Sequence, residues 1–353
     1  MRKKWIIIAQ IAATYIGTVV GAGFATGQEI LQFFTAFGFW GLLGIILSTA
    51  LFIWIGTKMM ILAKRIKAYS YQQFNEYLFG KVIGTAVNLF VFVTLFGVTC
   101  VMLSGTGAIF EEQLHWPYQA GIIVTLVLCY FVMLKGMQGI FWVNSLVVPL
   151  MIFFSVIVAL KVGFVDHELL RTKMTQAWEG WEGWKWLTSA FTYVAFNLAM
   201  AQAVLIPLGR EIDDESMLGW GGLWGGVGLG LMLTASHFAL QTIMPEALHF
   251  DIPIAVVIQN IGWFILFMFL LVVYGEIFTT LIANVFGMAR QIRTMFALPQ
   301  KWTVAAILLA SFLISQIGFS PLVSSLYPLF GYLGLGVLVY LVVMRLPEEK
   351  SDH

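Results

Sequence analysis

The residues best suited to chemistry in this chain lie in one glycine-rich run, Gly17-Thr-Val-Val-Gly-Ala-Gly-Phe-Ala-Thr-Gly-Gln-Glu29. Glycine loosens a helix, and a carboxylate at membrane depth is costly unless something compensates its charge. Both features interrupt an apolar stretch that starts at Trp5. Backbone that leaves the helical form inside a bilayer persists only where it is buried in protein or lines a wet cavity. The run therefore predicts a binding site within an interrupted helix.

A second carboxylate, Glu276, lies deep in the apolar stretch Leu270-Leu-Val-Val-Tyr-Gly-Glu-Ile-Phe-Thr-Thr280. Glu29 and Glu276 are the only acidic residues that we place within apolar spans, so each is a candidate for binding a coupling ion or carrying a proton. Two structural alternatives stay open. Glu29 can cap a helix that begins near Gln28, and Glu276 can be a buried hydrogen-bond partner.

The composition places these residues in a membrane protein. The chain is 60% hydrophobic and 10% charged, with a mean hydropathy of +0.90, whereas soluble domains are about 25% charged. Apolar runs of about 18 or more residues recur from end to end, which predicts an all-α polytopic fold in a single domain spanning residues 1–353. The net charge of +1 gives no indication of a nucleic-acid partner.

We expect ten spans, at about 6–36, 38–63, 83–110, 118–134, 139–161, 188–209, 219–241, 262–289, 302–319 and 322–344. With both termini in the cytoplasm, the only outside members of the 19 basic residues are Lys161, Arg171, Lys173 and Lys185. This asymmetry is the positive-inside pattern. It predicts a multi-pass protein of the plasma membrane with both ends cytoplasmic, and a first helix that is retained rather than cleaved.

Several features at the edges of the spans favour structural roles. The longest outside loop carries Trp178, Trp181, Trp184 and Trp186, which we interpret as an interfacial belt, with an outer gate as the alternative. Pro245–Pro253 predicts a second outside element. The glycines of Gly219–Gly230 have the spacing for close helix packing, and the two cysteines, Cys100 and Cys129, are expected to pack.

The sixth span carries Asn197, Gln202 and Pro207, which predict a second interruption. The first and sixth spans open two groups of five, at about 6–161 and 188–344, and a repeat of five spans inserts its second copy inverted. Interruptions at corresponding positions of two halves indicate a transporter site. A half-helix that begins at mid-membrane offers N–H groups to an anion, and one that ends there offers carbonyls to a cation.

Gly17–Phe24 followed by Gly27-Gln-Glu29 resembles the first helix of the amino acid–polyamine–organocation superfamily, which has the LeuT-type fold. The run is most similar to that of bacterial YkvI-like membrane proteins. The resemblance extends over the chain in topology, and in motif over the first span and Asn197–Gly209. It implies a sodium site made by the following groups: the carbonyls of Gly17 and Val20 and the hydroxyls of Thr279 and Thr280. Glu276, one turn before Thr280, departs from the simplest sodium pattern.

The same resemblance implies a solute site at the break, with contributions from neighbouring spans: Gly21, Ala22, Gly23, Phe24, Thr106, Asn197 and Gln202. Each side chain also has a structural alternative. Thr279 and Thr280 can bond carbonyls of their own helix. Thr106 and Ser104 can form a packing seam. Asn284 and His237 are expected mainly at helix interfaces, with a proton relay as the alternative for His237.

The expected function is secondary active transport of a small polar solute, an amino acid or related amine, by alternating access with Na⁺ or H⁺ as the coupling ion. A non-transporting sensor or complex subunit that keeps the pocket is the alternative, and a channel is less well supported. An enzyme is not expected. The sequence lacks a P-loop, a metal-ligand pair and a nucleophile elbow, and no strand precedes the glycine run. No cofactor is expected beyond the candidate Na⁺.

Overall fold

The computed structural model describes residues 2–134, 150–151, 153–154, 156–157, 160–161, 183–259, 262–296 and 299–347. Regular structure within these residues is helical throughout. In this part of the chain, 6 helices are long and apolar enough to cross a membrane: Phe39–Arg65, Tyr71–Gln113, Lys185–Glu211, Glu215–Thr242, Trp263–Ala289 and Phe319–Val343. Three shorter apolar helices accompany them: Lys4–Val19, Tyr118–Met133 and Lys301–Ser315. The prediction of an all-α multi-pass membrane protein is confirmed.

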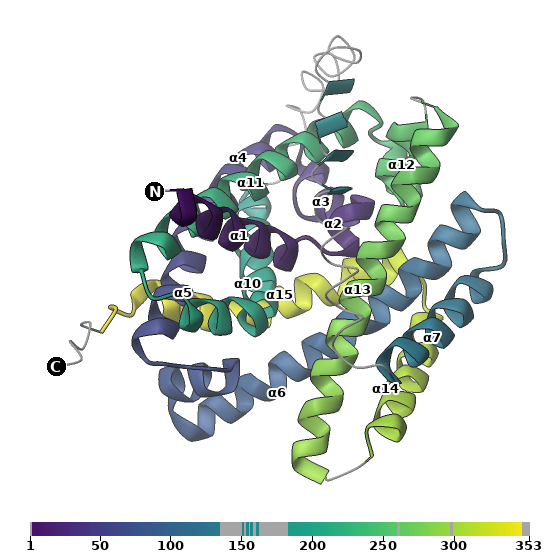
Figure 1. The fold of residues 1–353 in the computed structure, drawn as a ribbon. Helices are drawn as coiled ribbons and strands as arrows, with labels where there is room; N and C mark the ends of the chain where they lie inside the picture. Colours follow the sequence, from purple (N-terminus) through teal and green to yellow (C-terminus); the bar gives the residue numbers. More distant parts are fainter. Residues whose placement is uncertain are drawn as a thin grey trace.

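Every expected span except the fifth coincides with a described helix or helix group (Figure 1). The first half contains α1 (Arg2–Val19), α2 (Ala22–Thr26), α3 (Gln28–Phe33), α4 (Phe39–Leu51), η2 (Phe52–Gly56), α5 (Thr57–Arg65), α6 (Tyr71–Ala108), η3 (Ile109–Gln113) and α7 (Tyr118–Leu134). The second half contains α10 (Lys185–Glu211), α11 (Glu215–Thr242), η5 (Glu246–His249), α12 (Pro253–Gln259), α13 (Trp263–Phe296), α14 (Gln300–Ser315) and α15 (Phe319–Val343). Most of the fifth span, 139–161, lies outside the described residues, as do Trp178 and Trp181. The count of ten and the inverted repeat stay predictions.

The first span is broken as predicted. Its long helix α1 ends at Val19, and Gly21 follows with extended backbone (φ −129°, ψ −170°). The structure adds the short helix α2 inside the break. Gly27 then takes a left-handed conformation (φ 91°) between α2 and α3, and this conformation is readily adopted only by glycine.

The sixth span is not broken, so the prediction of a discontinuous helix 6 is wrong. Helix α10 runs unbroken from Lys185 to Glu211 with Pro207 inside it. Asn197 Nδ2 donates to the carbonyl of Tyr193 at 3.1 Å, four residues back, so its amide supports an intact helix. Pro207 removes one backbone donor near the end of the helix, and the remaining turn continues to Glu211.

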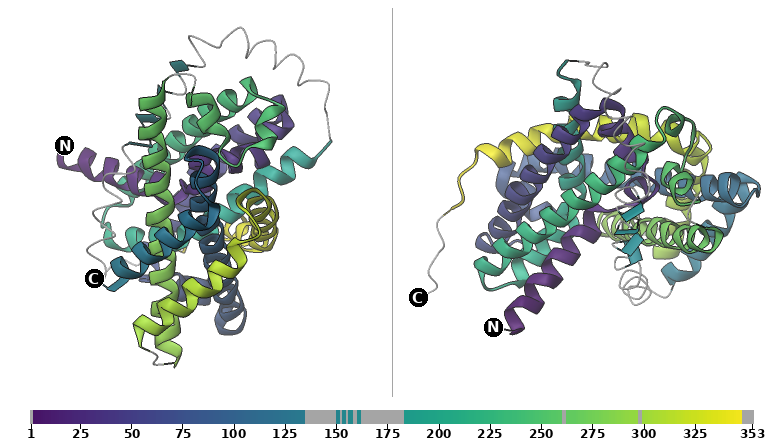
Figure 2. Two further views of the ribbon diagram at one scale, coloured as in Figure 1. Left: turned by 90° about the vertical axis from the view of Figure 1, so that its right-hand side faces the viewer. Right: turned by 90° about the horizontal axis from the view of Figure 1, so that it is seen from above.

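Helices α1, α10 and α11 pack into one bundle with α4 and α5. Helix α1 lies along α11 in Figures 1 and 2, where the glycines of α11 leave room for it. A methyl group on Gly225 would lie 2.7 Å from the ring of Tyr15, and one on Gly221 would lie 2.3 Å from Ile11. The predicted packing role of Gly219–Gly230 is therefore confirmed at these positions. Helix α13 packs against α6, α14 and the short α2.

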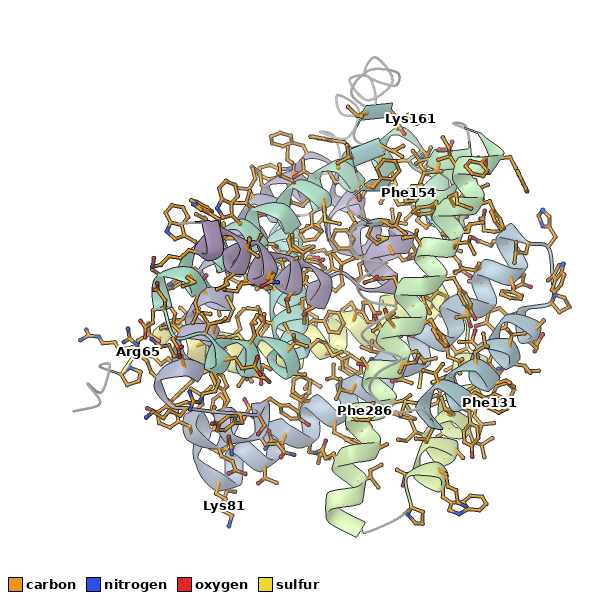
Figure 3. All side chains as sticks on the ribbon, viewed as in Figure 1. Arg65, Lys81, Phe131, Phe154, Lys161 and Phe286 are labelled. Atoms are coloured by element: carbon orange, nitrogen blue, oxygen red, sulfur yellow. The ribbon has the colours of Figure 1, made fainter. Side chains whose placement is uncertain are left out.

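The start of α1 and the segment that follows α15 lie on one side of the molecule, which we call the terminal face (Figure 1). Arg65, labelled at this side in Figure 3, forms a two-pronged ion pair with Glu215 at 2.9 and 2.7 Å and donates to the carbonyl of Pro347 at 2.6 Å. Lys4 pairs with Asp214 at 2.9 Å. The hydrogen bond from Lys4 is the main cause that lowers the pKa of Asp214.

Candidate functional site

The break in the first span exposes two sets of backbone groups. Val20 N donates to Ile16 O at 2.8 Å, which is the last such bond of α1, and Ala25 N donates to Gly21 O at 2.9 Å, which is the first of α2. Among the described residues, the carbonyls of Gly17–Val20 and the N–H groups of Ala22–Phe24 therefore have no backbone partner. Helix ends of this kind carry partial charges of opposite sign. The backbone groups that the sequence predicts to bind a cation and an anion therefore lack backbone hydrogen bonds in the described chain, and their binding roles stay predictions.

The break also borders open space. A methyl group on Gly21 would meet no atom of the described residues within 4 Å, and Gly21 is only partly buried. Ala22, Gly23 and Phe24, which follow it in α2, are buried. Solvent or a small solute can therefore approach the break at Gly21, while the rest of α2 is enclosed by protein.

Glu29 lies against this broken segment. It is 3% exposed, and its side chain turns back over α2, so that a methyl group on Gly23 would lie 2.7 Å from Glu29 Oε1. The N–H of Gln28 donates to the hydroxyl of Thr26 at 3.4 Å, whereas no described bond joins the Glu29 carboxylate to the start of α3. The arrangement favours a role at the break over the capping alternative.

Aromatic side chains enclose the Glu29 carboxyl group. Tyr193 of α10 and Tyr327 of α15 both lie within electrostatic range of it. The Tyr193 hydroxyl faces Glu29 without completing a hydrogen bond, and Glu29 Oε2 has no partner among the described residues. Tyr193 packs edge-on against Phe34 at 4.8 Å, and Tyr327 stacks on Phe196 at 4.5 Å. A carboxylate so enclosed requires a proton or a cation.

The second predicted carboxylate lies on the helix that packs against α2. Glu276 of α13 is 3% exposed, and its Oε2 also lacks a partner among the described residues. Thr279 donates its hydroxyl to the carbonyl of Glu276 at 3.0 Å, as the structural alternative predicted, although its oxygen keeps lone pairs for another ligand. Thr280 is partly exposed. Helix α13 packs on α2, whereas the carbonyls of Gly17 and Val20 belong to the end of α1, so the sodium site shared by these carbonyls with Thr279 and Thr280 stays a prediction.

Among the other predicted solute contacts, three side chains have hydrogen-bond partners within the protein, and one has a polar atom without a partner among the described residues. Thr106 donates to the carbonyl of Leu103 at 2.7 Å, and Ser104 bonds Tyr118, so both hydroxyls of α6 serve the local packing. Asn197 bonds within α10. Gln202 is fully buried and its Oε1 has no partner in the described part of the chain. Gln202 is therefore the residue of this group whose side chain can accept a further hydrogen bond.

Residues that sequence reasoning missed are the tyrosines around Glu29. Tyr193 lies one turn before Asn197, and this spacing was available as a signal. Nothing in the sequence indicated that Tyr327 lies within electrostatic range of Glu29. His237 lies where its interface interpretation put it: Nδ1 is 3.2 Å from the Thr35 hydroxyl, and Gln241 Nε2 donates to Thr35 O at 2.8 Å.

The charged side chains that are buried in the described part of the protein are all acidic. Among the side chains whose burial the structure describes, the buried acidic ones are Glu29 and Glu276, and no lysine or arginine is buried. No cluster of acidic, histidine and cysteine side chains that could hold a metal ion is found in these residues. The interior is thus suited to one positive group at each carboxylate.

Comparison with known proteins identifies the family and the fold of the chain. No family model matches the chain. The chain is 43% identical over 343 residues to the membrane protein YkvI of Bacillus subtilis (strain 168), with 97% of each chain covered. It is 24% identical over 341 residues to the protein YyaD of the same organism, with 96% of each covered.

Two solved structures share the fold at low identity. The inward-facing conformation of Mhp1 matches with a TM-score of 0.58 and 13% identity, over 94% of this chain and 75% of that one. A manganese transporter of Eremococcus coleocola matches with a TM-score of 0.59 and 13% identity, over 95% and 78%. From its likeness to YkvI along nearly the whole length, the chain belongs to the YkvI-like family of bacterial membrane proteins, and its fold is of the LeuT type.

Proposed function

We propose that this protein is a secondary active transporter for a small polar solute with an amine group, an amino acid or a related amine, which it moves by alternating access. The observation that carries the proposal is the break between α1 and α2. There, unpaired carbonyls and unpaired N–H groups lie beside the enclosed carboxylate of Glu29. Such a site can hold a positive and a negative group at once.

In this proposal the N–H groups of Ala22, Gly23 and Phe24 receive the acidic end of the solute, if it has one. Glu29 receives the amine or a proton. Glu276, with Thr279 and Thr280 and the carbonyls of Gly17 and Val20, holds the coupling ion, Na⁺ or H⁺. Support comes from the side chains whose burial the structure describes: no lysine or arginine among them is buried, so none of them competes with a bound cation.

The moving parts in this proposal are the bundle of α1–α5, α10 and α11 and the surrounding helices. The bundle is held together by contacts of α1 with α11 and of α10 with α5. Two fold neighbours are themselves named as transporters, Mhp1 and the manganese transporter, and this likeness favours transport over an enzymatic role. We propose a plasma-membrane location with the terminal face in the cytoplasm, on the basis of the positive-inside pattern.

Ligand-induced thermal stabilisation of the purified protein tests the proposal. A panel of amino acids and amines is screened with and without sodium at several pH values. We expect at least one amine-bearing solute to raise the melting temperature of the wild type and of Glu246→Gln, an exposed acid that serves as the matched control. Glu29→Gln should remain folded and lose the shift.

Flux in proteoliposomes then separates the two classes of function. A solute that stabilises the protein and is also accumulated supports transport, whereas binding without flux supports the sensor alternative. A Glu29→Gln protein that keeps the full shift with every stabilising solute would contradict the proposed site.

A further inference from the structure

A cluster of polar side chains joins four elements at the side of the molecule opposite the terminal face. We call this side the α12 face and the cluster the Gln28 latch: Gln28, Glu112, Asp251 and Ser320. Gln28 Nε2 donates to Phe250 O at 2.5 Å and to Ser320 Oγ at 2.9 Å. Glu112 Oε1 and Oε2 accept from the N–H groups of Asp251 and Ile252 at 2.6 and 3.0 Å.

Asp251 and Ser320 close the latch. Asp251 Oδ1 accepts from Ser320 N at 3.1 Å and also from the Ser320 hydroxyl. The Ser320 oxygen thus donates to Asp251 while it accepts from Gln28, so one hydroxyl connects α15 to both α3 and the segment before α12. The two carboxylates stabilise the N-terminal ends of α12 and α15, where unpaired N–H groups favour negative charge.

The latch acts directly on the broken helix. Gln28 precedes Glu29 in α3, and both follow the left-handed Gly27. Helix α12 packs closely against Gly27, because a methyl group on Gly27 would lie 2.6 Å from Ile254 Cγ1. Helix α3 therefore cannot move away from α12 and α15 unless the bonds of Gln28 break.

The two faces are far apart. Ser320 lies in the first turn of α15, and the residues after its other end bond to Lys58 and Arg65 at the terminal face. A helix of 25 residues is about 37 Å long. Along the chain, α2 lies between Gly21 and the latch residue Gln28.

We propose that the Gln28 latch seals the α12 face in the state described here, so that the break is reached from the terminal face, and that its release opens the α12 face to Glu29. The proposal depends on the alternating access of the proposed function. Loss of either hydrogen bond of Gln28 should then raise the population of the state in which the α12 face is open.

Cysteine labelling in cells tests the latch without any solute. Gly21→Cys serves as the reporter, since its side chain has room, and native Cys100 and Cys129 are both buried. A membrane-impermeant maleimide is applied to intact cells and to inverted vesicles. Glu246→Cys at the α12 face and Lys4→Cys at the terminal face, both at exposed residues, establish which preparation presents which face.

We expect the reporter alone to label in the preparation that exposes the terminal face. Adding Gln28→Ala or the milder Ser320→Ala should raise labelling from the α12 face by about tenfold, as expected for loss of one or two net hydrogen bonds. Asn75→Ala is the matched control, because it removes a buried amide bond, to Asn88 at 3.0 Å, that lies outside the latch.

The proposal is overturned if the reporter alone labels rapidly from the α12 face, if both latch variants label as slowly as the reporter alone, or if Asn75→Ala has the same effect as they do. Failure of the proposed function gives a different result. In that case Glu29→Gln leaves ligand binding unchanged while the latch variants still alter labelling.

Discussion

At the scale of single residues, the main feature is that two buried carboxylates have unused acceptor atoms. Glu29 Oε2 and Glu276 Oε2 both lack partners within the described chain. A buried polar group without a partner is destabilising by about 1–3 kcal/mol, and an unpaired buried charge is costlier still. Such groups are retained where a ligand or proton completes them. Glu276 has the stronger case for function, because it lies in mid-helix where no capping role exists.

The first prediction concerns Glu276. Glu276→Gln keeps the size of the side chain and removes its ability to ionise, so we expect the protein to fold with an unchanged or higher melting temperature. Coupled uptake in proteoliposomes should be abolished, while Glu246→Gln behaves as the wild type. Uptake at the wild-type rate by Glu276→Gln would show that this carboxylate does not couple transport.

The second prediction concerns Gly23. Gly23→Ala places a methyl group 2.7 Å from Glu29 Oε1 and 2.6 Å from its Cγ. Because the acid is a flexible side chain, it should swing aside at a stability cost of about 1 kcal/mol, and ligand-induced stabilisation should fall. Gly336→Ala in α15 is the control, since its methyl group meets no described atom within 4 Å and Gly336 is not part of the proposed site.

A double-mutant cycle shows whether the two residues act on each other. If Gly23→Ala acts by displacing Glu29, its effect on binding should vanish in a Glu29→Ala background. Equal effects of Gly23→Ala in both backgrounds would mean that it perturbs α2 directly.

At the scale of the elements, the first span and α10 show what the sequence can and cannot predict. The break at Gly21–Gly27 was predictable because glycine is the residue that leaves a helix at low steric cost. The continuity of α10 was not. Asn197 is equally compatible with an unwound turn and with a bond to the carbonyl of Tyr193 four residues back, and only the tertiary packing decides between them.

The third prediction belongs to the hinge between α2 and α3. Gly27→Ala should lower stability by about 2–4 kcal/mol, because alanine is strained in the left-handed region by about 1–2 kcal/mol and its methyl group overpacks Ile254 by a similar amount. Chemical or thermal unfolding in detergent measures the loss. When Ile254→Ala is added to the Gly27→Ala protein, it should remove the part of the stability loss that comes from the steric clash and leave the part that comes from backbone strain.

Gly21→Ala serves as the control for stability. We expect its unfolding free energy to equal that of the wild type, because the backbone of Gly21 is extended and a methyl group there meets no described atom within 4 Å. If Gly21→Ala and Gly27→Ala are equally destabilising, the hinge is not at Gly27.

At the scale of the whole molecule, different chemistry joins the elements at the two faces. Hydrogen bonds of Gln28 join α3 to α15 and to the segment before α12 at the α12 face, and ion pairs of Arg65 and Lys4 join α5 and α1 to the start of α11 at the terminal face. Apolar run lengths predicted the spans, but not these contacts. Gln28 and Ser320 are 292 residues apart, and no local pattern of spacing or periodicity relates residues so distant in sequence.

The last prediction concerns the ion pairs of the terminal face. Glu215 accepts both prongs of Arg65, with side chains only 19–20% exposed, and lies 3.6 Å from Lys64. Charge-assisted, two-pronged pairs are stronger than ordinary hydrogen bonds, and Glu215 also lies in the first turn of α11, where negative charge is favoured. We expect Glu215→Gln to lower the unfolding free energy by about 1–3 kcal/mol. Lys4→Ala should change the unfolding free energy little, because Lys4 is 64% exposed and exposed pairs contribute about 0–1 kcal/mol.

Unfolding at low and high salt distinguishes the two ion pairs. The stability loss in Glu215→Gln should persist in high salt. A Lys4→Ala effect of equal size would mean that exposed charge, rather than the Arg65 pair, holds the terminal face together.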